Sequence, residues 1–479
     1  MVNRAGLCAT SAVGRDLACC GCREARIRTR LPLVIVVCLG GPAASAQAPP
    51  TVEELVGLIE TQQRLIDEQG RRLDALQQQL DDLRRGTTTP SAGQPPSVAE
   101  DTDPRGQKPE APPDLVRAGD FPGSFKIPGS EAAFKVGGLV RVNWVSTLDP
   151  LLIEDRFITA DIPVDVTPPP IGGRVDVMAI PSRFNLDLRT PTGVGYMRAY
   201  LEADFAGIGN TLRLRHAYGQ WRRLLFGQTW STFADPDAEP DGIDFEGLNA
   251  IVRFRQSQVR WSWATTEHLR VSFALENPNT EVSGLTAANR RPDLIARVRW
   301  QPASTRHLQA AVLYRELRGF PSSVPASIVG ATGWGVTASG RWPLPAWQGR
   351  DAVLFSVNAG TGVGRYITDL AAAGNQDGVY DSASNRVQPL RAASGHAGYE
   401  HWWTDQFHST LTFAAVAVRN SGLQPDDAYY LTRRYSANVI WSPIPRLDLV
   451  AEFLSGVRIN RNRHRADANQ IQIGSTFRF

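Results

Sequence analysis

The sequence predicts an all-β protein: an antiparallel transmembrane β-barrel of sixteen strands, with eighteen as the alternative, preceded by an N-terminal coiled-coil helix. Three observations predict this fold. The chain begins with an export signal, residues beyond Phe121 alternate between apolar and polar, and the last such segment ends on Phe479. Alternation in segments of about ten residues places one face against lipid and the other against water, as outer-membrane barrels require.

The first 46 residues have the composition of a secretory signal peptide. Four arginines between positions 23 and 30 precede the apolar stretch 31–39, which is followed by Ala44-Ser45-Ala46. This order predicts cleavage after Ala46 and export from the cytoplasm. A membrane anchor helix is the alternative, but the apolar stretch is too short to cross about 30 Å of hydrocarbon and contains Pro32.

Cysteine usage and charge both change after the signal segment. All five cysteines lie within the first 38 residues, so the rest of the chain has no thiol for a disulfide, catalysis or a metal. A body without cysteine suits export to an oxidising compartment. Without the six arginines and two acidic residues of 1–46, 45 basic and 46 acidic residues remain of the 51 and 48 in the chain. This balance excludes nucleic-acid binding through bulk charge.

Residues 47–85 are predicted to form a periplasmic coiled coil. From Val52 to Leu83, eight of the ten positions spaced alternately by three and four residues are apolar, and Gln62 and Gln69 are the exceptions. A heptad this long favours a coiled coil over a solvated single helix, although it does not fix the number of chains. Residues 86–118 follow as a linker, because they carry seven prolines between positions 90 and 113.

The barrel is predicted to span residues 119–479. In the segment 134–144 the even positions are apolar or glycine, and they alternate with residues such as Lys135 and Arg141. The same alternation recurs at 197–205, 269–276, 294–301 and 470–479. Seventeen candidate strands can be counted in this way, and since single-chain bacterial barrels have an even number, we choose sixteen.

A soluble β-sandwich also alternates, and three features favour the barrel over it. Very short turns, as at 191–194 and 442–446, are mixed with long polar connections such as 371–386. A terminal aromatic residue after an alternating strand resembles the signal by which the barrel-assembly machinery recognises its substrates. Aromatic residues also lie near segment ends, as interfacial girdles would. They are Trp221, Trp230, Tyr399, Trp402, Trp403, Tyr429, Tyr430 and Trp441.

One long loop stands out among the tight hairpins. Two short alternating segments, 212–221 and 224–231, flank a turn at Arg222–Arg223 and are followed by the acidic loop 233–249. A loop of this length is usually functional, and inside a barrel it can fold inward as a constriction. Its carboxylates would then make the pore selective for cations if they lined the narrowest point. They are Asp235, Asp237, Glu239, Asp241, Asp244 and Glu246.

Arginines on the polar face of the strands point to the opposite selectivity. Lysine occurs only at 108, 126 and 135, so nearly every later cation is arginine. Guanidinium groups bind carboxylates bidentately, and a set of them facing a pore would select and guide organic anions. Codon bias, or neutralisation by the loop carboxylates, is the alternative explanation. The pore-lining candidates are Arg198, Arg213, Arg215, Arg253, Arg255, Arg297 and Arg299.

The sequence gives little support to an enzyme. The segment after residue 119 has no cysteine and neither a G-x-S-x-G nor an H-E-x-x-H motif. On one strand His396 and Glu400 would share a face while His401 points away, which disfavours a metal site. A calcium site at Asp377 and Asp381 is less expected than ordinary turn chemistry. We therefore predict no catalytic residues, no metal and no cofactor.

Three blocks of sequence resemble the DcaP-like trimeric outer-membrane porins. They are FKIPGSEAAFKVGGLVRVNW, SRFNLDLRTPTGVGYMRAYLEADF, and LRLRHAYGQW with LLFGQTWSTF followed by the acidic loop. The order of signal, coiled coil, linker and barrel also matches. The resemblance implies a sixteen-stranded barrel that trimerises, a periplasmic coiled coil, and passive uptake of small anions such as dicarboxylates. The scarcity of lysine speaks against the phosphate porins that use a lysine ladder.

The predicted function is therefore passive diffusion of small hydrophilic solutes, preferably organic anions, across the outer membrane of a Gram-negative bacterium. The predicted partners are outer-membrane lipid, two further copies in a homotrimer, anionic solutes and, through Phe479, the barrel-assembly machinery. One alternative is a barrel enzyme of the lipase or esterase type, which needs a serine and a histidine within hydrogen-bond reach. Another is a tether that binds the cell wall through the coiled coil.

Overall fold

The computed structural model describes residues 117–167, 171–322, 327–345 and 349–479. The predicted signal peptide, the coiled coil and nearly all of the linker lie outside the described residues. Within the described ranges, no helix has the length and apolar character needed to cross a membrane.

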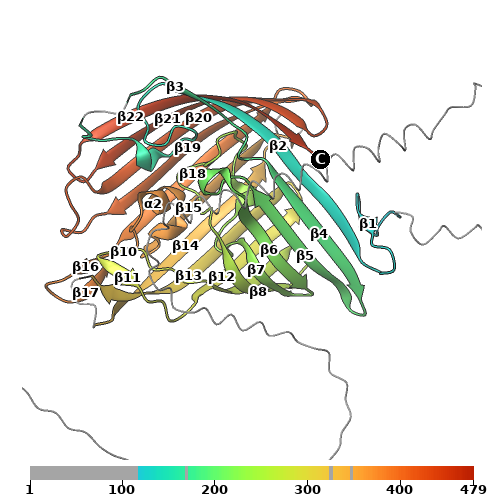
Figure 1. The fold of residues 1–479 in the computed structure, drawn as a ribbon, viewed down its shortest axis with the longest axis horizontal. Helices are drawn as coiled ribbons and strands as arrows, with labels where there is room; N and C mark the ends of the chain where they lie inside the picture. The colour runs from blue at the N-terminus through green and yellow to red at the C-terminus, as the bar shows by residue number, and fades with distance from the viewer. Residues whose placement is uncertain (1–116, 168–170, 323–326, 346–348) are drawn as a thin grey trace, which may run out of the picture. The chain divides into compact units, whose positions relative to one another are not determined.

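The described chain folds into a closed antiparallel barrel of sixteen strands (Figure 1). Each strand pairs with its neighbour along the chain, and the last strand, β22, closes the barrel on the first, β2. The predicted fold class and strand number are thus confirmed for the barrel. The wall strands are β2 (Ala133–Thr147), β3 (Arg174–Met178) continued by β4 (Arg183–Thr192), β5 (Gly195–Asp204), β6 (Arg213–Trp221), β7 (Leu224–Trp230), β8 (Arg255–Ala264), β9 (Leu269–Glu276), β12 (Asp293–Ala303), β13 (Arg306–Pro321), β14 (Val329–Pro343), β15 (Ala352–Thr361), β18 (Arg391–Trp402), β19 (Phe407–Arg419), β20 (Tyr429–Ile444), β21 (Leu447–Asn460) and β22 (Arg465–Arg478).

Smaller elements lie in the connections between wall strands. The connection expected as a long polar loop at 371–386 is in fact partly ordered, since it holds the end of a helix, one short strand and the first residue of another. Those strands, β16 and β17, form a three-stranded sheet with β10. The smaller elements are β1 (Phe125–Lys126), β10 (Val282–Ser283), β11 (Leu285–Ala287), β16 (Gly378–Asp381), β17 (Arg386–Pro389), the helix α2 (Thr368–Ala373), and the 3-10 turns η1 (Thr159–Asp161), η2 (Ile208–Asn210), η3 (Pro236–Ala238) and η5 (Gly364–Tyr366).

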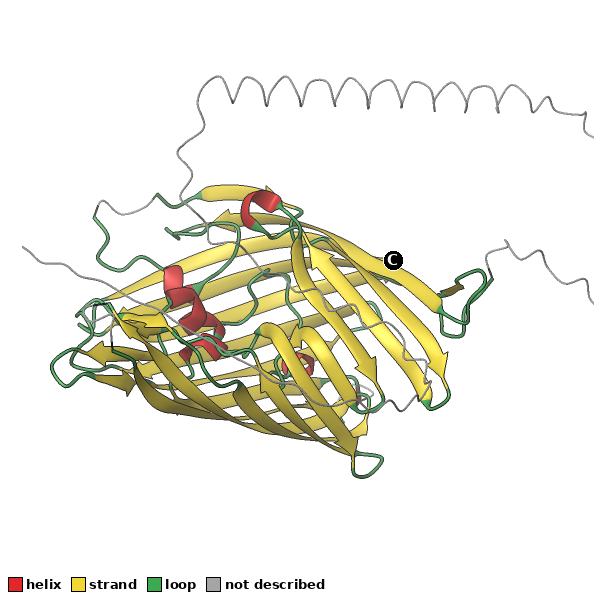
Figure 2. Cartoon of the chain, turned by 60° about the horizontal axis from the view of Figure 1, so that its bottom comes forward, coloured by secondary structure: helices red, strands yellow, loops and turns green. Residues whose placement is uncertain are grey.

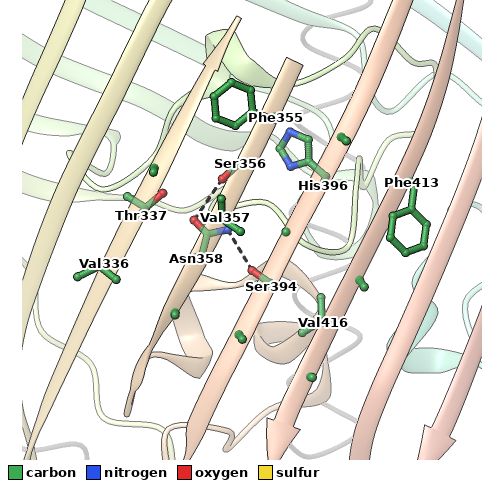
Figure 3. A pocket seen from close by; sticks show the side chains of 17 residues that line it. Val336, Thr337, Phe355, Ser356, Val357, Asn358, Ser394, His396, Phe413 and Val416 are labelled. Carbon is green, nitrogen blue, oxygen red and sulfur yellow. Dashed lines mark hydrogen bonds between the residues drawn. The ribbon is translucent and has the colours of Figure 1, made fainter. Parts of the chain in front are cut away.

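Side chains alternate between the two faces of the wall, and β15 illustrates it. Val357 is 58% exposed on the outside, whereas its neighbours Ser356 and Asn358 are buried. Asn358 accepts a hydrogen bond from Ser356 (3.2 Å) and donates one to Ser394 of β18 (3.0 Å), as Figure 3 shows. Exposed valine, leucine, phenylalanine and tryptophan at outer positions of the other strands complete an apolar surface suited to lipid.

Some of the aromatic residues expected in the girdles lie on this outer surface. Trp221, Trp403 and Trp441 are exposed near the short turns. Tyr429 is an exception, because it is buried and its hydroxyl donates to Asp369 of α2 at 2.7 Å. The prediction that Tyr429 belongs to a girdle is therefore wrong. The structure uses its phenol as an interior hydrogen-bond donor.

Short turns join the strands at one end of the barrel and long connections join them at the other. The predicted turn at Arg222–Arg223 is present between β6 and β7, and Arg222 has φ +54°. Arg446 has φ +75° in the turn between β20 and β21. Positive φ is the geometry of tight hairpin turns. In bacterial barrels the end with short turns faces the periplasm, so we assign the long connections to the cell exterior.

The barrel closes at a seam near the C-terminus. The backbone of Phe479 exchanges two hydrogen bonds with Gly138 of β2, at 3.1 and 3.3 Å. A Cβ atom on Gly138 would lie 2.8 Å from the Phe479 ring and 2.4 Å from the carbonyl oxygen of Arg183. Gly138 is thus the position at which the last residue of the chain can approach the first wall strand.

Candidate functional site

The acidic loop lies inside the barrel. It leaves the wall after β7 and reaches strands far from β7 and β8 before it returns. Asn438 of β20 donates to the carbonyl oxygen of Asp241 (2.7 Å), and Asn143 of β2 donates to that of Ile243 (3.0 Å). Glu452 of β21 accepts a hydrogen bond from the Ile243 backbone amide at 2.7 Å. We call residues 231–254 the inward loop.

The first carboxylate of the inward loop is an anchor. Asp235 accepts hydrogen bonds from Arg299 of β12 (3.0 Å) and Ser339 of β14 (2.6 Å), and it pairs with His307 of β13 (2.9 Å). Burial alone would raise the pKa of Asp235, but these hydrogen bonds and the Arg299 charge hold it below its ordinary value. Asp235 is therefore a charged group whose partners already satisfy it.

Asp244 is a second, more deeply buried anchor. Its side chain and that of Arg434 of β20 are 2% and 1% exposed, and their atoms Oδ2 and Nη2 lie 2.9 Å apart. Arg434 also donates to the carbonyl oxygens of Phe157 (3.0 Å) and Gly247. One guanidinium thus joins the wall, the inward loop and the connection after β2.

The other four loop carboxylates also have basic neighbours. Asp237 pairs with Arg299 (2.6 Å) and Asp241 with His408 (3.3 Å). Glu239 lies 3.8 Å from Arg253, and Glu246 lies 3.9 Å from Arg156. The six candidate carboxylates of the loop, Asp235 to Glu246, are thus each placed beside a base, and they form no free acidic ring.

Two further connections fold inward and pack on the loop. Figure 2 shows short helical segments within the ring of strands. Ile158, Phe233, Leu248, Ile367 and Leu370 belong to one buried apolar cluster that joins η1, the inward loop and α2. Backbone hydrogen bonds from residues 368 and 369 to residues 251 and 249 reinforce this contact. The interior of the barrel is therefore partly filled by ordered connections.

A polar cavity of about 170 Å³ remains between the inward loop and the wall formed by β2, β4, β6 and β8. Four of the seven predicted pore-lining arginines lie here, together with two that the prediction missed. We call this group the arginine pocket. It is lined by Arg141, Arg183, Arg213, Arg215, Arg253, Arg255, Pro181, Phe245 and Glu246.

Two carboxylates of β5, Glu202 and Asp204, lie at the centre of the arginine pocket and pair with its arginines. Asp204 pairs with Arg213 and with Arg215, each at 2.7 Å. Glu202 pairs with Arg215 at 2.6 Å and with Arg183 at 3.3 Å. A β-bulge between β5 and β6 at Glu202/Ala203 allows these charges to converge from both strands. The carboxylates fix the orientation of the guanidinium groups.

The arginine pocket carries more positive than negative charge. Among the described residues, Arg141 and Arg255 form no ion pair; Arg141 donates to Thr476 (3.0 Å) and Arg255 lies 4.5 Å over the Trp230 ring. Six arginines face only four carboxylates, namely Glu202, Asp204, Glu239 and Glu246. Burial raises the pKa of both Glu239 and Glu246, so these two carboxylates lose their negative charge at a higher pH than an exposed glutamate does.

The remaining predicted arginines lie elsewhere. Arg198 binds Asp187 of β4 through two hydrogen bonds, at 2.8 and 2.9 Å. Arg299 anchors the inward loop, and Arg297 of β12 donates to Ser272 at 3.5 Å. The two arginines that the prediction missed, Arg141 and Arg183, stand on the polar face of alternating segments. That signal was present in the sequence, but only the register of β2 and β4 brings them to the pocket.

Comparison with known proteins agrees with this architecture. The family model described as "DcaP outer membrane protein" matches residues 131–478. The outer membrane channel DcaP of Acinetobacter baumannii is similar with a TM-score of 0.64 and 20% identity, over 76% of this chain and 100% of that chain. No curated protein matches the chain.

More distant porins share less of the structure. An anion-selective porin from Comamonas acidovorans has a TM-score of 0.48 and 10% identity, over 73% of this chain and 100% of that chain. OmpT of Vibrio cholerae has a TM-score of 0.47 and 10% identity, over 74% and 99%. The family match spans well over half of the chain, so the protein belongs to the DcaP outer membrane protein family and is an outer-membrane β-barrel of the porin type.

Proposed function

We propose that this porin passes small hydrophilic solutes by passive diffusion and favours organic anions such as dicarboxylates. The observation that carries the proposal is the surplus of two positive charges in the arginine pocket, beside the inward loop. A cleft lined by one sign of charge raises the local concentration of the opposite ion. Guanidinium groups also match carboxylates in geometry.

The partial exposure of three arginine side chains also supports the arginine pocket as a site that attracts anions. The side chains of Arg183, Arg213 and Arg253 are 31%, 37% and 29% exposed, so their ion pairs leave donors free for a solute. The inward loop does not oppose them strongly, because its carboxylates are engaged with bases. An anion entering the cavity therefore meets guanidinium donors first.

The surroundings of five of the seven histidines favour a channel over an enzyme. His307 and His408 contact loop carboxylates, and His396 contacts the carbonyl oxygen of Ala238 (3.0 Å). His216 contacts Thr229 (3.0 Å), and His401 contacts Asp351 (2.8 Å). These roles position the loop and the wall. We therefore propose that the protein has no enzymatic activity, no metal and no cofactor.

We also propose that the protein is a homotrimer with the coiled coil in the periplasm, and that Phe479 serves as its assembly signal. The heptad pattern from Val52 to Leu83 supports association, because an apolar stripe of this spacing is expected to pack against the same stripe of another helix. Deleting residues 52–83 separates the diffusion channel from the alternative of a tether to the cell wall. If the protein is a tether, the deletion removes its attachment to the cell wall although the barrel still conducts ions. If the protein is a diffusion channel, the deletion leaves its function, the flux of solutes, in place.

The test of selectivity is the reversal potential of purified protein in a planar bilayer under a tenfold KCl gradient, with succinate then added. We expect a potential of chloride sign and a reduced current in succinate. The triple variant R141Q/R183Q/R253Q should move the potential toward that of potassium. Arg350, in the connection between β14 and β15, pairs with the exposed Asp405 of the turn between β18 and β19, so R350Q is the matched control. A potassium-sign potential in the unmodified protein would refute the proposal.

A further inference from the structure

A second group of arginines lies on the inner face, nearer to the short turns. Its members are Arg260 of β8, Arg270 of β9 and Arg297 of β12. Gln258, two residues before Arg260, bonds to Thr232 of the inward loop, so this face of β8 points inward. Arg299, two residues after Arg297, reaches the inward loop as well. Arg270 lies opposite Arg299 in the register and shares its face.

The register places the three arginines close together. Arg297 pairs with Ser272 of β9, and Arg260 pairs with Ala274 of the same strand. With strands about 4.8 Å apart and residues about 3.4 Å apart, the three backbone positions lie roughly 8 to 14 Å from one another. Arginine side chains are long enough to converge on one small molecule from such positions. We call Arg260, Arg270 and Arg297 the lower arginine triad.

In the triad, unlike at the centre of the arginine pocket, no carboxylate of the described residues lies within ion-pair distance of a guanidinium group; Glu276 and Asp235 act on Arg260 and Arg297 only from farther away. In the part of the chain that the structure describes, Arg260 and Arg270 form no ion pair, and Arg297 has a single hydrogen bond to Ser272. The neighbouring Arg299, by contrast, is engaged by Asp235 and Asp237 at 3.0 and 2.6 Å. The carboxylates of the inward loop thus neutralise Arg299, the fourth arginine of this wall, and form no ion pair with the three arginines of the triad.

The triad is accessible from the aqueous interior. Arg270 is exposed, and Arg260 and Arg297 are half-buried. Arg270 and Arg299 also line a cavity of about 280 Å³ together with Gln301 and residues of the turn 264–268. Glu267 lies in that turn without an ion pair among the described residues, and it is the carboxylate at the edge of this cavity. Like charges placed together are unfavourable unless a counter-ion joins them.

We propose that the lower arginine triad is a second anion-binding site, on the periplasmic side of the inward loop, for small organic acids that carry two or three carboxylates. The inference rests on the proposed function, because the ligands are anions that pass the arginine pocket. A multivalent anion can engage two or three guanidinium groups at once, whereas a monovalent anion satisfies only one. The site therefore favours multivalent solutes, and it makes the channel asymmetric.

Asymmetric block of single channels tests the site. Citrate is added to one side of the bilayer and then, after washing, to the other, and the half-blocking concentration for the chloride current is measured for each side. In the unmodified protein we expect the two concentrations to differ by roughly tenfold, the effect of three charges screened by salt. Because the comparison is made within one channel, the direction of insertion need not be known.

The variant R260Q/R270Q/R297Q should remove the asymmetry by weakening block from the more sensitive side only. Arg306, at the start of β13, lies 4.6 Å over the ring of Trp342 in β14, so R306Q is the matched control and should leave the asymmetry intact. If the triple variant does not fold, R270Q alone changes an exposed residue and should reduce the asymmetry.

Equal block from both sides in the unmodified protein, or asymmetry that persists in the variants, would overturn the second site. A potassium-sign reversal potential would instead overturn the proposed function.

Discussion

Replacing Arg434 by methionine is expected to release the inward loop from the wall. The substitution keeps most of the side-chain volume and removes only the guanidinium group. Asp244 would then be buried without its cation, while its backbone amide still donates to the nearby Glu452 carboxylate at 3.3 Å. Two buried carboxylates would face one another across the loop backbone, and the carbonyl oxygens of Phe157 and Gly247 would lose a donor.

The magnitude follows from the burial of the pair. Both side chains are at most 2% exposed. Breaking a buried ion pair by removing one partner costs about 3–5 kcal/mol. At about 1.4 kcal/mol per tenfold change, that shifts the balance between the docked and released loop by at least about a hundredfold. The wall itself should persist, because the pairing of β20 with β19 and β21 does not depend on this side chain.

Single-channel recording is the assay. R434M channels should show a larger conductance and more open-channel noise than the unmodified protein. The double variant D244N/R434M leaves no unpaired charge, and it should recover most of the difference. Arg461 and the 84% exposed Asp426 form a surface pair at 3.5 Å, so R461M should change nothing. Conductance and noise in R434M equal to those of the unmodified protein would refute the anchoring role.

Two further predictions concern the charge of the arginine pocket and the closure of the barrel. Burial raises the pKa of Glu239 and Glu246 above the ordinary 4.5, so acidification from pH 7 to 4.5 should protonate most of them and shift the reversal potential further toward chloride. E239Q/E246Q should show this shift at pH 7 and a smaller pH response, and a shift toward potassium would contradict the assignment. G138V should prevent the seam with Phe479 from closing, because there is no room for a side chain at this position. A gel-mobility assay of heated and unheated protein would detect this as loss of the folded form. The control G193V places a side chain in open space in a turn and should fold normally.

The barrel was predictable because every wall strand obeys the same physical condition. One face meets lipid and the other meets the interior, so a period of two persists even where the residues themselves vary. The segments 134–144 and 294–301 fall within β2 and β12, and the turn at Arg222–Arg223 is where the sequence places it.

The roles of the charged side chains were less predictable. Asp244 and Asp237 belong to the same acidic loop, yet one is a buried anchor and the other is 68% exposed. Their partners, Arg434 and Arg299, are 190 and 62 residues away in sequence. Composition gives the number of charges, but only the path of the loop across the interior decides which are paired. The same limit explains why Arg141 and Arg183 were missed.

The inward loop and the arginines together suggest how an interior with nearly balanced charge becomes selective. The loop carries six carboxylates, and the bases beside most of them lie on β12, β13, β19 and β20 or in the connection after β2. Most carboxylates of the inward loop are therefore paired with bases on one side of the interior. The part formed by β2, β4, β6 and β8 keeps arginines that its own carboxylates only partly balance. On this view selectivity depends less on the total charge of the interior than on which wall the loop is tied to. A loop tied to the opposite wall would carry its other four carboxylates into the arginine pocket as well and cancel the surplus.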